Sequence, residues 1–110
     1  MYDYNAKLIR VVDGDTIDAM IDLGFNIWIK KRIRLHGINT PEIRTRDLKE
    51  KQEGFAAMER LSILLEESDG LFILKSHGIG KYGRCIATLY IEHRNINELL
   101  LFEGYAEKYE

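Results

Sequence analysis

The chain has 110 residues, of which 45% are hydrophobic, and these values predict one compact domain over residues 1–110. One proline and nine glycines exclude a fibrous or low-complexity chain. The net charge of −2 argues against a passive, electrostatic nucleic-acid binder, which would be basic overall. It does not argue against an enzyme whose basic groups gather at one site.

Cys85 is the only cysteine, which excludes an intrachain disulfide and a zinc site built from several cysteines. The chain opens without an apolar segment behind a basic start, and its apolar runs, such as Leu71–Leu74, are too short to span a bilayer. We therefore expect a cytoplasmic protein without a membrane partner, and we expect it to be a monomer.

Three strands are predicted in the first forty residues. An apolar run over Leu8–Val12 ends at the turn signal Asp13-Gly14, and Thr16–Asp22 is a second strand. A long third strand is predicted over Asn26–Ile38, where apolar residues alternate with polar ones. The charged run Lys30–Arg32 blurs this alternation and indicates a bend or bulge.

A helix is predicted to open at Asp47, because Asp47 and Glu50 have the spacing of a capping box, and to end before Gly70. Its apolar side chains at helical spacing are expected in the core: Phe55, Met58, Leu61 and Leu65.

Two further strands, Leu71–Leu74 and Arg84–Ile91, flank a glycine-rich loop. A short helix is predicted over Asn95–Phe102, with Gly104 in a left-handed conformation just after it. Three strands, a helix, two strands and a helix form the layout of an OB-fold. The predicted class is therefore α+β, with a five-stranded Greek-key barrel, a helix between strands three and four, and a short C-terminal helix.

Asp13 and Asp15 flank Gly14 in a tight turn. Two carboxylates 4 Å apart repel by roughly 4 kcal/mol at an effective dielectric near 20. A cation bound between them would remove this penalty, and Ca²⁺ prefers such oxygen ligands. The alternative is an ordinary Asp-Gly turn with solvated carboxylates.

The segment Asn39-Thr40-Pro41-Glu42 contains the only proline. Pro41 favours an extended conformation for Thr40, which sets the direction of the Thr40 carbonyl and the Glu42 carboxylate. Glu42 could accept a proton from water. The alternative is a strand-ending turn with a surface glutamate.

Arg34 precedes that segment, and Arg84 follows the glycine-rich loop. Guanidinium groups match phosphate oxygens in pairs and stay charged at any relevant pH. Two of them on one phosphate would stabilise the charge that develops during phosphodiester cleavage. Each arginine taken alone could equally be a solvated surface residue.

The Asp13–Thr16 turn, the Arg34–Glu42 segment and the Lys81–Arg84 loop together resemble the staphylococcal (micrococcal) nuclease family, over about residues 6–106. This resemblance implies an OB-fold and Ca²⁺-dependent hydrolysis of DNA and RNA. We expect single-stranded or frayed substrates.

The resemblance also implies roles at a metal site. Asp15 resembles a metal-ligand carboxylate, Thr40 resembles the residue that offers its backbone carbonyl to the metal, and Asp13 resembles a nearby acid. Asn39 stands where the family usually has a second metal carboxylate. An amide oxygen can coordinate Ca²⁺, but one negative charge is lost, so we predict weaker binding or a changed metal preference.

The remaining roles concern the phosphate. Glu42 resembles the proposed general base, and Arg34 and Arg84 resemble the two phosphate-binding arginines. Lys81 and Tyr82 resemble residues that contact the terminal phosphate of a bound nucleotide. Because Asn39 departs from the family pattern, an alternative stays open: a nuclease-like module that binds nucleic acid or a protein partner without cleaving.

Overall fold

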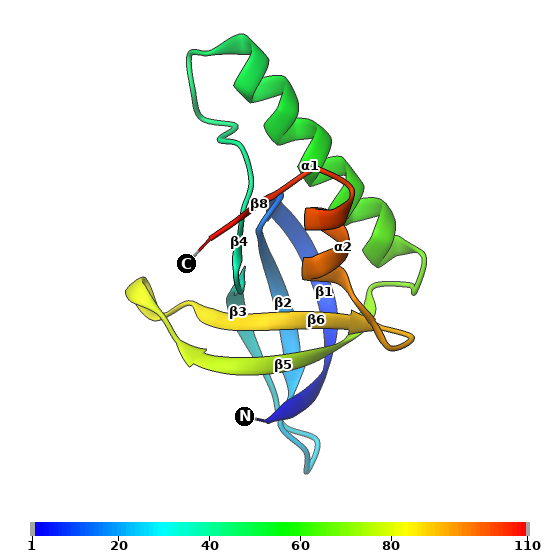
Figure 1. The fold of residues 1–110 in the computed structure, drawn as a ribbon. Helices are drawn as coiled ribbons and strands as arrows, with labels where there is room; N and C mark the ends of the chain where they lie inside the picture. Colours follow the sequence, from blue (N-terminus) through cyan, green and yellow to red (C-terminus); the bar gives the residue numbers. More distant parts are fainter. Residues whose placement is uncertain (1, 110) are drawn as a thin grey trace.

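Five strands close into a barrel in the computed structural model, which describes residues 2–109 (Figure 1). They are β1 (Asp3–Asp13), β2 (Thr16–Asp22), β3 (Trp28–Leu35), β5 (Leu71–Ile79) and β6 (Cys85–Ile91). Their order is β3-β2-β1-β5-β6, and a parallel pairing of β3 with β6 closes the barrel. The other neighbours are antiparallel. The predicted OB-fold is confirmed.

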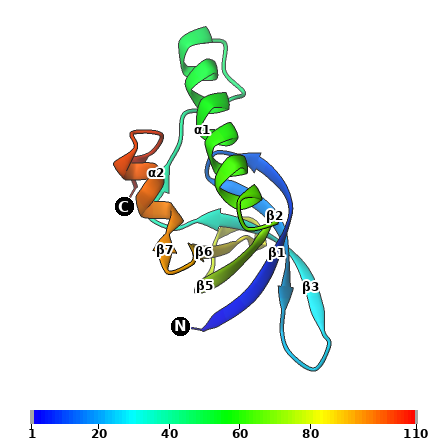
Figure 2. The same ribbon diagram turned by 90° about the vertical axis from the view of Figure 1, so that its right-hand side faces the viewer.

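Two helices pack against the barrel. Helix α1 (Leu48–Glu66) lies between β4 and β5 in sequence, and its N-terminal half projects beyond the barrel, while α2 (Ile96–Phe102) lies beside it (Figures 1 and 2). The buried residues of α1 are Gly54, Ala57, Leu61, Leu64 and Leu65. The prediction was right for Leu61 and Leu65 but wrong for Phe55, which is 49% exposed. The reason is that Phe55 lies beside, and not on, the buried helix face that begins with Gly54 and Ala57.

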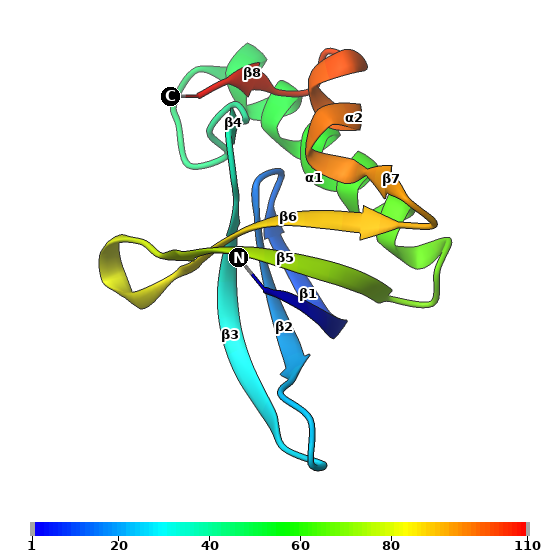
Figure 3. The same cartoon turned by 60° about the horizontal axis from the view of Figure 1, so that its bottom comes forward.

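Short elements complete the chain. Strand β4 (Ile38–Asn39) pairs with β8 (Glu107–Lys108), and β7 (Arg94–Asn95) extends the sheet beside β6. Figure 3 shows the β4–β8 ladder outside the barrel, near the helices. A single 3₁₀ turn, η1 (Lys81–Gly83), lies between β5 and β6. The β4–β8 ladder matters for the site because it holds Asn39 next to the C-terminal segment.

The long third strand predicted over residues 26–38 is interrupted. Strand β3 ends at Leu35, and Gly37 takes a positive φ of 77° before β4 begins. The predicted irregularity near Lys30–Arg32 is also wrong, because β2 and β3 pair in continuous register from Thr16–Arg34 to Asp22–Trp28. The register shifts lie in β1 instead, beside Leu8 and Asp13. The charged run therefore does not break the ladder.

Both helix N-termini are capped by the side chains expected from the sequence. Asp47 Oδ1 accepts hydrogen bonds from the backbone N–H groups of Lys49 (3.0 Å) and Glu50 (3.3 Å). Asn95 Oδ1 accepts one from Glu98 N–H at 3.0 Å. The capping box at Asp47 is incomplete, because the Asp47 N–H donates to Thr45 Oγ1 rather than to Glu50. Gly104, with φ of 84°, follows α2 as predicted.

The core fills the barrel and continues under the two helices. Its fully buried members include the side chains of Ile17, Ile33, Leu35, Leu61, Leu65, Leu74, Leu89, Ile96 and Leu100. Cys85 is buried in the same cluster, as expected for a small core residue. This core fixes the ends of β2 and β3 and the position of α1, between which the polar site residues lie.

Gly54 allows α1 to cross the segment that carries Glu42. A Cβ at this position would lie 2.7 Å from the carbonyl oxygen of Pro41 and 2.7 Å from Ile43 Cγ2. We predict that Gly54→Ala lowers the free energy of unfolding by about 1–3 kcal/mol through overpacking, although alanine is the better helix former by about 1 kcal/mol. Urea denaturation would measure this, with Gln52→Ala on the exposed face of α1 as control. A stabilised Gly54→Ala variant would contradict the close contact.

Candidate functional site

The buried carboxylate of Asp15 joins three segments that lie far apart in the sequence. Its Oδ2 accepts a hydrogen bond from the Thr40 backbone N–H at 3.0 Å and lies 3.5 Å from Arg34 Nη2. Its Oδ1 accepts one from Thr16 Oγ1 at 3.1 Å, and its backbone carbonyl accepts one from Leu35 N–H at 2.8 Å. The β1–β2 turn is thereby fixed against the ends of β3 and β4.

Gly14 lets this turn approach Thr40. A Cβ on Gly14 would lie 2.7 Å from Ala57 Cβ in α1 and 2.9 Å from both Thr40 Cγ2 and Thr40 Oγ1. Its φ is not positive, so the glycine is required for space rather than for a left-handed turn conformation. The Asp-Gly turn signal was therefore located correctly, but its physical reason is contact with Thr40 and α1.

Asp13 and Asp15 differ in their affinity for a proton, because the pKa of Asp13 is raised and the pKa of Asp15 is lowered. Burial raises the pKa of Asp13 from its ordinary 3.8 to about 6, and both the hydrogen bond with Asp15 and the charge of Asp15 contribute to this rise. Burial alone would also raise the pKa of Asp15, but bonds from Asp13 and Thr40 and the charge of Arg34 outweigh it and lower that pKa. Asp15 is thus the persistent anion, and Asp13 is the group that a cation would deprotonate.

Arg34 is held by contacts on several sides. Its Nη1 donates to the Leu35 carbonyl at 2.9 Å and its Nη2 to Asn39 Oδ1 at 3.2 Å. The guanidinium lies over the Tyr109 ring at 5.6 Å from the ring centroid. Arg34, Asn39 and Asp15 therefore belong to one cluster, as the sequence predicted, and Tyr109 is brought beside them by the β4–β8 ladder.

A pocket of about 370 Å³ opens next to this cluster. It is lined by Asp13, Glu42, Tyr82 and Arg84, four of the residues selected from the sequence, which come from three separate segments. Glu42 and Tyr82 are exposed, and Tyr82, 93% exposed with φ of 62°, has Arg84 over its ring at 5.9 Å. Lys81 lies on the same short turn but outside the pocket lining.

The sequence reasoning missed part of the pocket wall. Val12, Thr16, Arg32, Ile43 and Arg44 also line it. Arg32 could have been found, because it lies two residues before Arg34 in a strand and so projects from the same face. The signal was masked by the adjacent lysines, because the charged run over residues 30–32 was interpreted as a bend or bulge in the strand.

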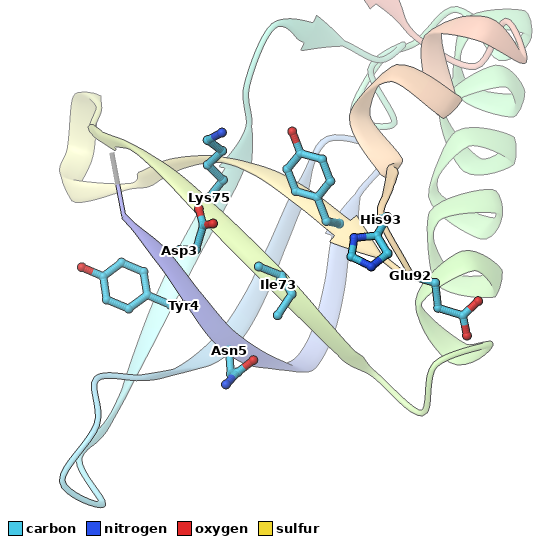
Figure 4. A pocket seen from close by; sticks show the side chains of 8 residues that line it. Asp3, Tyr4, Asn5, Ile73, Lys75, Glu92 and His93 are labelled. Atoms are coloured by element: carbon cyan, nitrogen blue, oxygen red, sulfur yellow. The ribbon is translucent and has the colours of Figure 1, made fainter.

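Two other cavities border the barrel. One, of about 280 Å³, is lined by Asn39, Thr40, Pro41, Glu42 and three further glutamates, Glu50, Glu53 and Glu107. The largest, about 680 Å³, lies over the outer side of β1, β5 and β6 (Figure 4). It contains none of the residues selected from the sequence, and its charged side chains, Asp3, Lys75 and Glu92, are of both signs. The pocket of about 370 Å³ is therefore the one that combines candidate acidic and basic residues, Glu42 and Arg84.

The residues selected as metal ligands lie in or next to the Asp15 cluster. Within residues 2–109, no three histidine, cysteine or acidic side chains are grouped as ligands of one metal. The available donors are instead mixed: the Asp15 and Asp13 carboxylates, the Asn39 amide oxygen and the Thr40 carbonyl. Carboxylate, amide and carbonyl oxygens are ligands that Ca²⁺ accepts. Burial is the largest cause of the raised pKa of Asp13, so a cation bound beside this carboxylate would favour its charged form.

These observations agree with comparisons to known proteins. The family model of the staphylococcal nuclease homologues matches residues 32–110, and the chain belongs to this family. An uncharacterized protein of Methanocaldococcus jannaschii, MJ1439, is 30% identical over 128 residues, covering 96% of this chain and 59% of that protein. The protein ParB of Escherichia coli is 26% identical over 117 residues, covering 97% of this chain and 58% of ParB.

The chain therefore spans about three fifths of the length of these relatives. No helix in the described part of the chain combines the length and the apolar composition needed to cross a membrane.

The raised pKa of Asp13 has a consequence for stability. The folded protein holds this proton more tightly than the unfolded chain, so the stabilising contribution is complete below pH 3.8 and is lost as the pH rises through about 6. We predict that, in chelator at pH 8, Asp13→Asn increases the free energy of unfolding by about 1–2 kcal/mol. This value follows from the pKa shift of Asp13 and is halved because Asp13 is partly exposed to solvent. The increase should shrink toward pH 4.

Denaturant titrations at both pH values would measure this, with the exposed Asp3→Asn as control. Added Ca²⁺ should stabilise the unaltered protein more than Asp13→Asn, because the cation replaces the proton. Equal gains at pH 4 and pH 8 would contradict the assignment.

Proposed function

We propose that this chain is a Ca²⁺-dependent nuclease that hydrolyses phosphodiester bonds of single-stranded or frayed DNA and RNA. One observation carries the proposal: Asp13, Glu42 and Arg84, from three distant segments, line one pocket beside the buried Asp15–Arg34 pair. An acid cluster, a proton acceptor and two guanidinium groups are the parts that phosphodiester hydrolysis requires. Family membership supports the same reading.

In this proposal the two arginines bind the phosphate. Arg84 lines the pocket from the position just before β6, and within residues 2–109 its side chain makes one hydrogen bond, a weak one from Nε to the Lys81 carbonyl at 3.4 Å, and lies over the Tyr82 ring. Arg34 is held rigidly by Leu35, Asn39 and Asp15. Positioned donors stabilise developing charge without reorganisation during the reaction, so a rigid Arg34 and an available Arg84 suit this role.

Glu42 is the proposed acceptor of the proton of the attacking water. It lies in the loop between β4 and α1, after Pro41, and Gly54 packs against the backbone of this segment. Its side chain is exposed and lines the pocket together with Arg84. A Ca²⁺ ion held by Asp15, Asn39 and the Thr40 carbonyl, with Asp13 adjacent, would supply positive charge to polarise the phosphate.

A second candidate function is favoured by Asn39. This residue contributes no charge to the donor set, and its Oδ1 accepts a hydrogen bond from Arg34. A chain with a weakened metal site could bind nucleic acid, or a protein partner, without cleaving. The presence of Glu42, Arg34 and Arg84 around one site makes hydrolysis the better proposal.

We predict that Glu42→Gln lowers the rate of hydrolysis of heat-denatured DNA by about 10²–10⁴-fold, because the proton acceptor is lost. Arg84→Ala should lower it by about 10²–10³-fold through lost charge stabilisation. Rates would be followed across a Ca²⁺ series with a chelator control, and Glu59→Gln on α1 serves as the matched variant. Near-unaltered rates in either site variant would refute the mechanism. A folded parent protein that never cleaves would favour the binding module.

We further predict that Asn39→Asp binds Ca²⁺ more tightly, because it adds a charge to the donor set. Isothermal titration calorimetry would measure the change, and Asn5→Asp, an exposed residue over the largest cavity, adds the same net charge away from the site. If both variants changed Ca²⁺ affinity equally, the effect would come from net charge, and Asn39 would not be a ligand.

A further inference from the structure

Arg32 and Arg34 occupy adjacent rows on one face of the β2–β3 ladder. In the register of these strands Thr16 is opposite Arg34 and Asp18 is opposite Arg32. Residues two apart in a strand point to the same side, about 6.6–6.8 Å from each other along the strand. That spacing is of the same order as the distance between neighbouring phosphates in an extended single strand.

Asp18 fixes the orientation of Arg32. Its carboxylate, 7% exposed, accepts bonds from Arg32 Nε at 2.9 Å and from Arg32 Nη2 at 3.2 Å. The side-on, two-point contact holds the guanidinium plane. Within residues 2–109 the third nitrogen, Nη1, donates no hydrogen bond, and Arg32 lines the pocket that contains Glu42 and Arg84.

Arg10 shares Asp18 but not the pocket. Its Nε donates to Asp18 Oδ2 at 3.0 Å, and its side chain is 63% exposed. The two arginines therefore have the same ion-pair partner and the same charge, yet only Arg32 lines the pocket. The two-point contact with the buried Asp18 carboxylate holds the guanidinium fork of Arg32 in place before a ligand arrives.

The other charges of the pocket fit a second anionic group. Arg44 and Arg84 line the same pocket as Arg32, together with the acids Asp13 and Glu42. Resting on the proposed function, we propose that Arg32, oriented by Asp18, binds the phosphate adjacent to the scissile one, so that the site takes a polynucleotide in preference to a mononucleotide. Arg32 is a substrate-binding residue in this scheme, and Asp18 is a positioning residue.

Binding measured in chelator tests this without requiring cleavage. The probe is a fluorescently labelled oligothymidylate, followed by anisotropy at several salt concentrations, and thymidine monophosphate is the competitor with a single phosphate. Arg32→Ala should weaken oligonucleotide binding about tenfold and reduce the slope of log affinity against log salt by about 0.7, the value for one phosphate contact on a single strand. Its affinity for the mononucleotide should not change.

Arg10→Ala is the matched control, because it removes an equal charge from the same ion-pair partner, Asp18. It should retain both the oligonucleotide affinity and the salt slope. Arg32→Lys should keep the slope but lose part of the affinity, since an ammonium group is not held by Asp18 as a fork. This variant also covers the case in which Arg32→Ala does not fold, which circular dichroism would reveal.

The outcomes separate this inference from the proposed function. Equal losses in Arg32→Ala and Arg10→Ala, or an equal loss for the mononucleotide, would overturn the adjacent-phosphate site even if the parent protein cleaves DNA. Arg32-dependent oligonucleotide binding by a parent protein that never cleaves would support this site and refute hydrolysis. A folded parent protein that binds no oligonucleotide at low salt in chelator would overturn the adjacent-phosphate site, and the Ca²⁺-dependent cleavage assay would decide the proposed function separately.

Discussion

The buried carboxylate of Asp15 is the interaction on which the site depends. Removing a carboxylate from water is costly unless it is paired and hydrogen-bonded, so its partners must keep their places. Those partners are the Thr40 backbone, Thr16 and Arg34, and the Asp15 carbonyl binds Leu35 N–H. One residue thus sets the relative position of a turn, a strand end and the segment that leads to Glu42.

Close packing reinforces this arrangement. Gly14 and Gly54 stand at two contacts where a methyl group would collide with neighbouring atoms, the first against Thr40 and the second against the Pro41 carbonyl. Helix α1 touches both contacts, through Ala57 and through Gly54 itself. The helix therefore determines how the barrel turn and the Glu42 segment meet, although it contributes no side chain to the pocket at Arg84.

Local charge rather than net charge governs the chemistry of the pocket. The chain is slightly acidic overall, yet Arg32, Arg44 and Arg84 share one pocket wall. Asp18 keeps its own charge, because hydrogen bonds from Arg32 and then Arg10 lower its pKa to about 2. Asn39, which carries no charge, lies beside Arg34 in the adjacent cluster. Under the proposed function it would leave the cation donors with one negative charge fewer than an aspartate at that position, while the arginines of the pocket would still attract phosphate.

The sequence by itself determined the order of the elements and the class of fold, and it selected candidate site residues. Alternation of apolar residues located β2 and β6 to within one residue, and cap residues such as Asp47 located the helices, because these signals act between near neighbours. The Asp13–Asp15 turn, the Asn39–Glu42 segment and Arg84 were selected from spacing and residue type, and the structure places them together.

Only the tertiary structure decided the rest. The break after Leu35, the exposure of Phe55 and the pairing of β4 with β8 depend on what packs beneath each segment, which local pattern does not encode. Gly14 looked like a turn residue, but it is required by Thr40, twenty-six positions away. Arg32 belonged to a charged run that indicated a bend or bulge, but strand register puts it opposite Asp18, and it lines the pocket that also contains Arg84. Only long-range contacts reveal the roles of such residues, because the charge of an arginine or the small size of a glycine matters only when a residue from a distant part of the chain lies next to it.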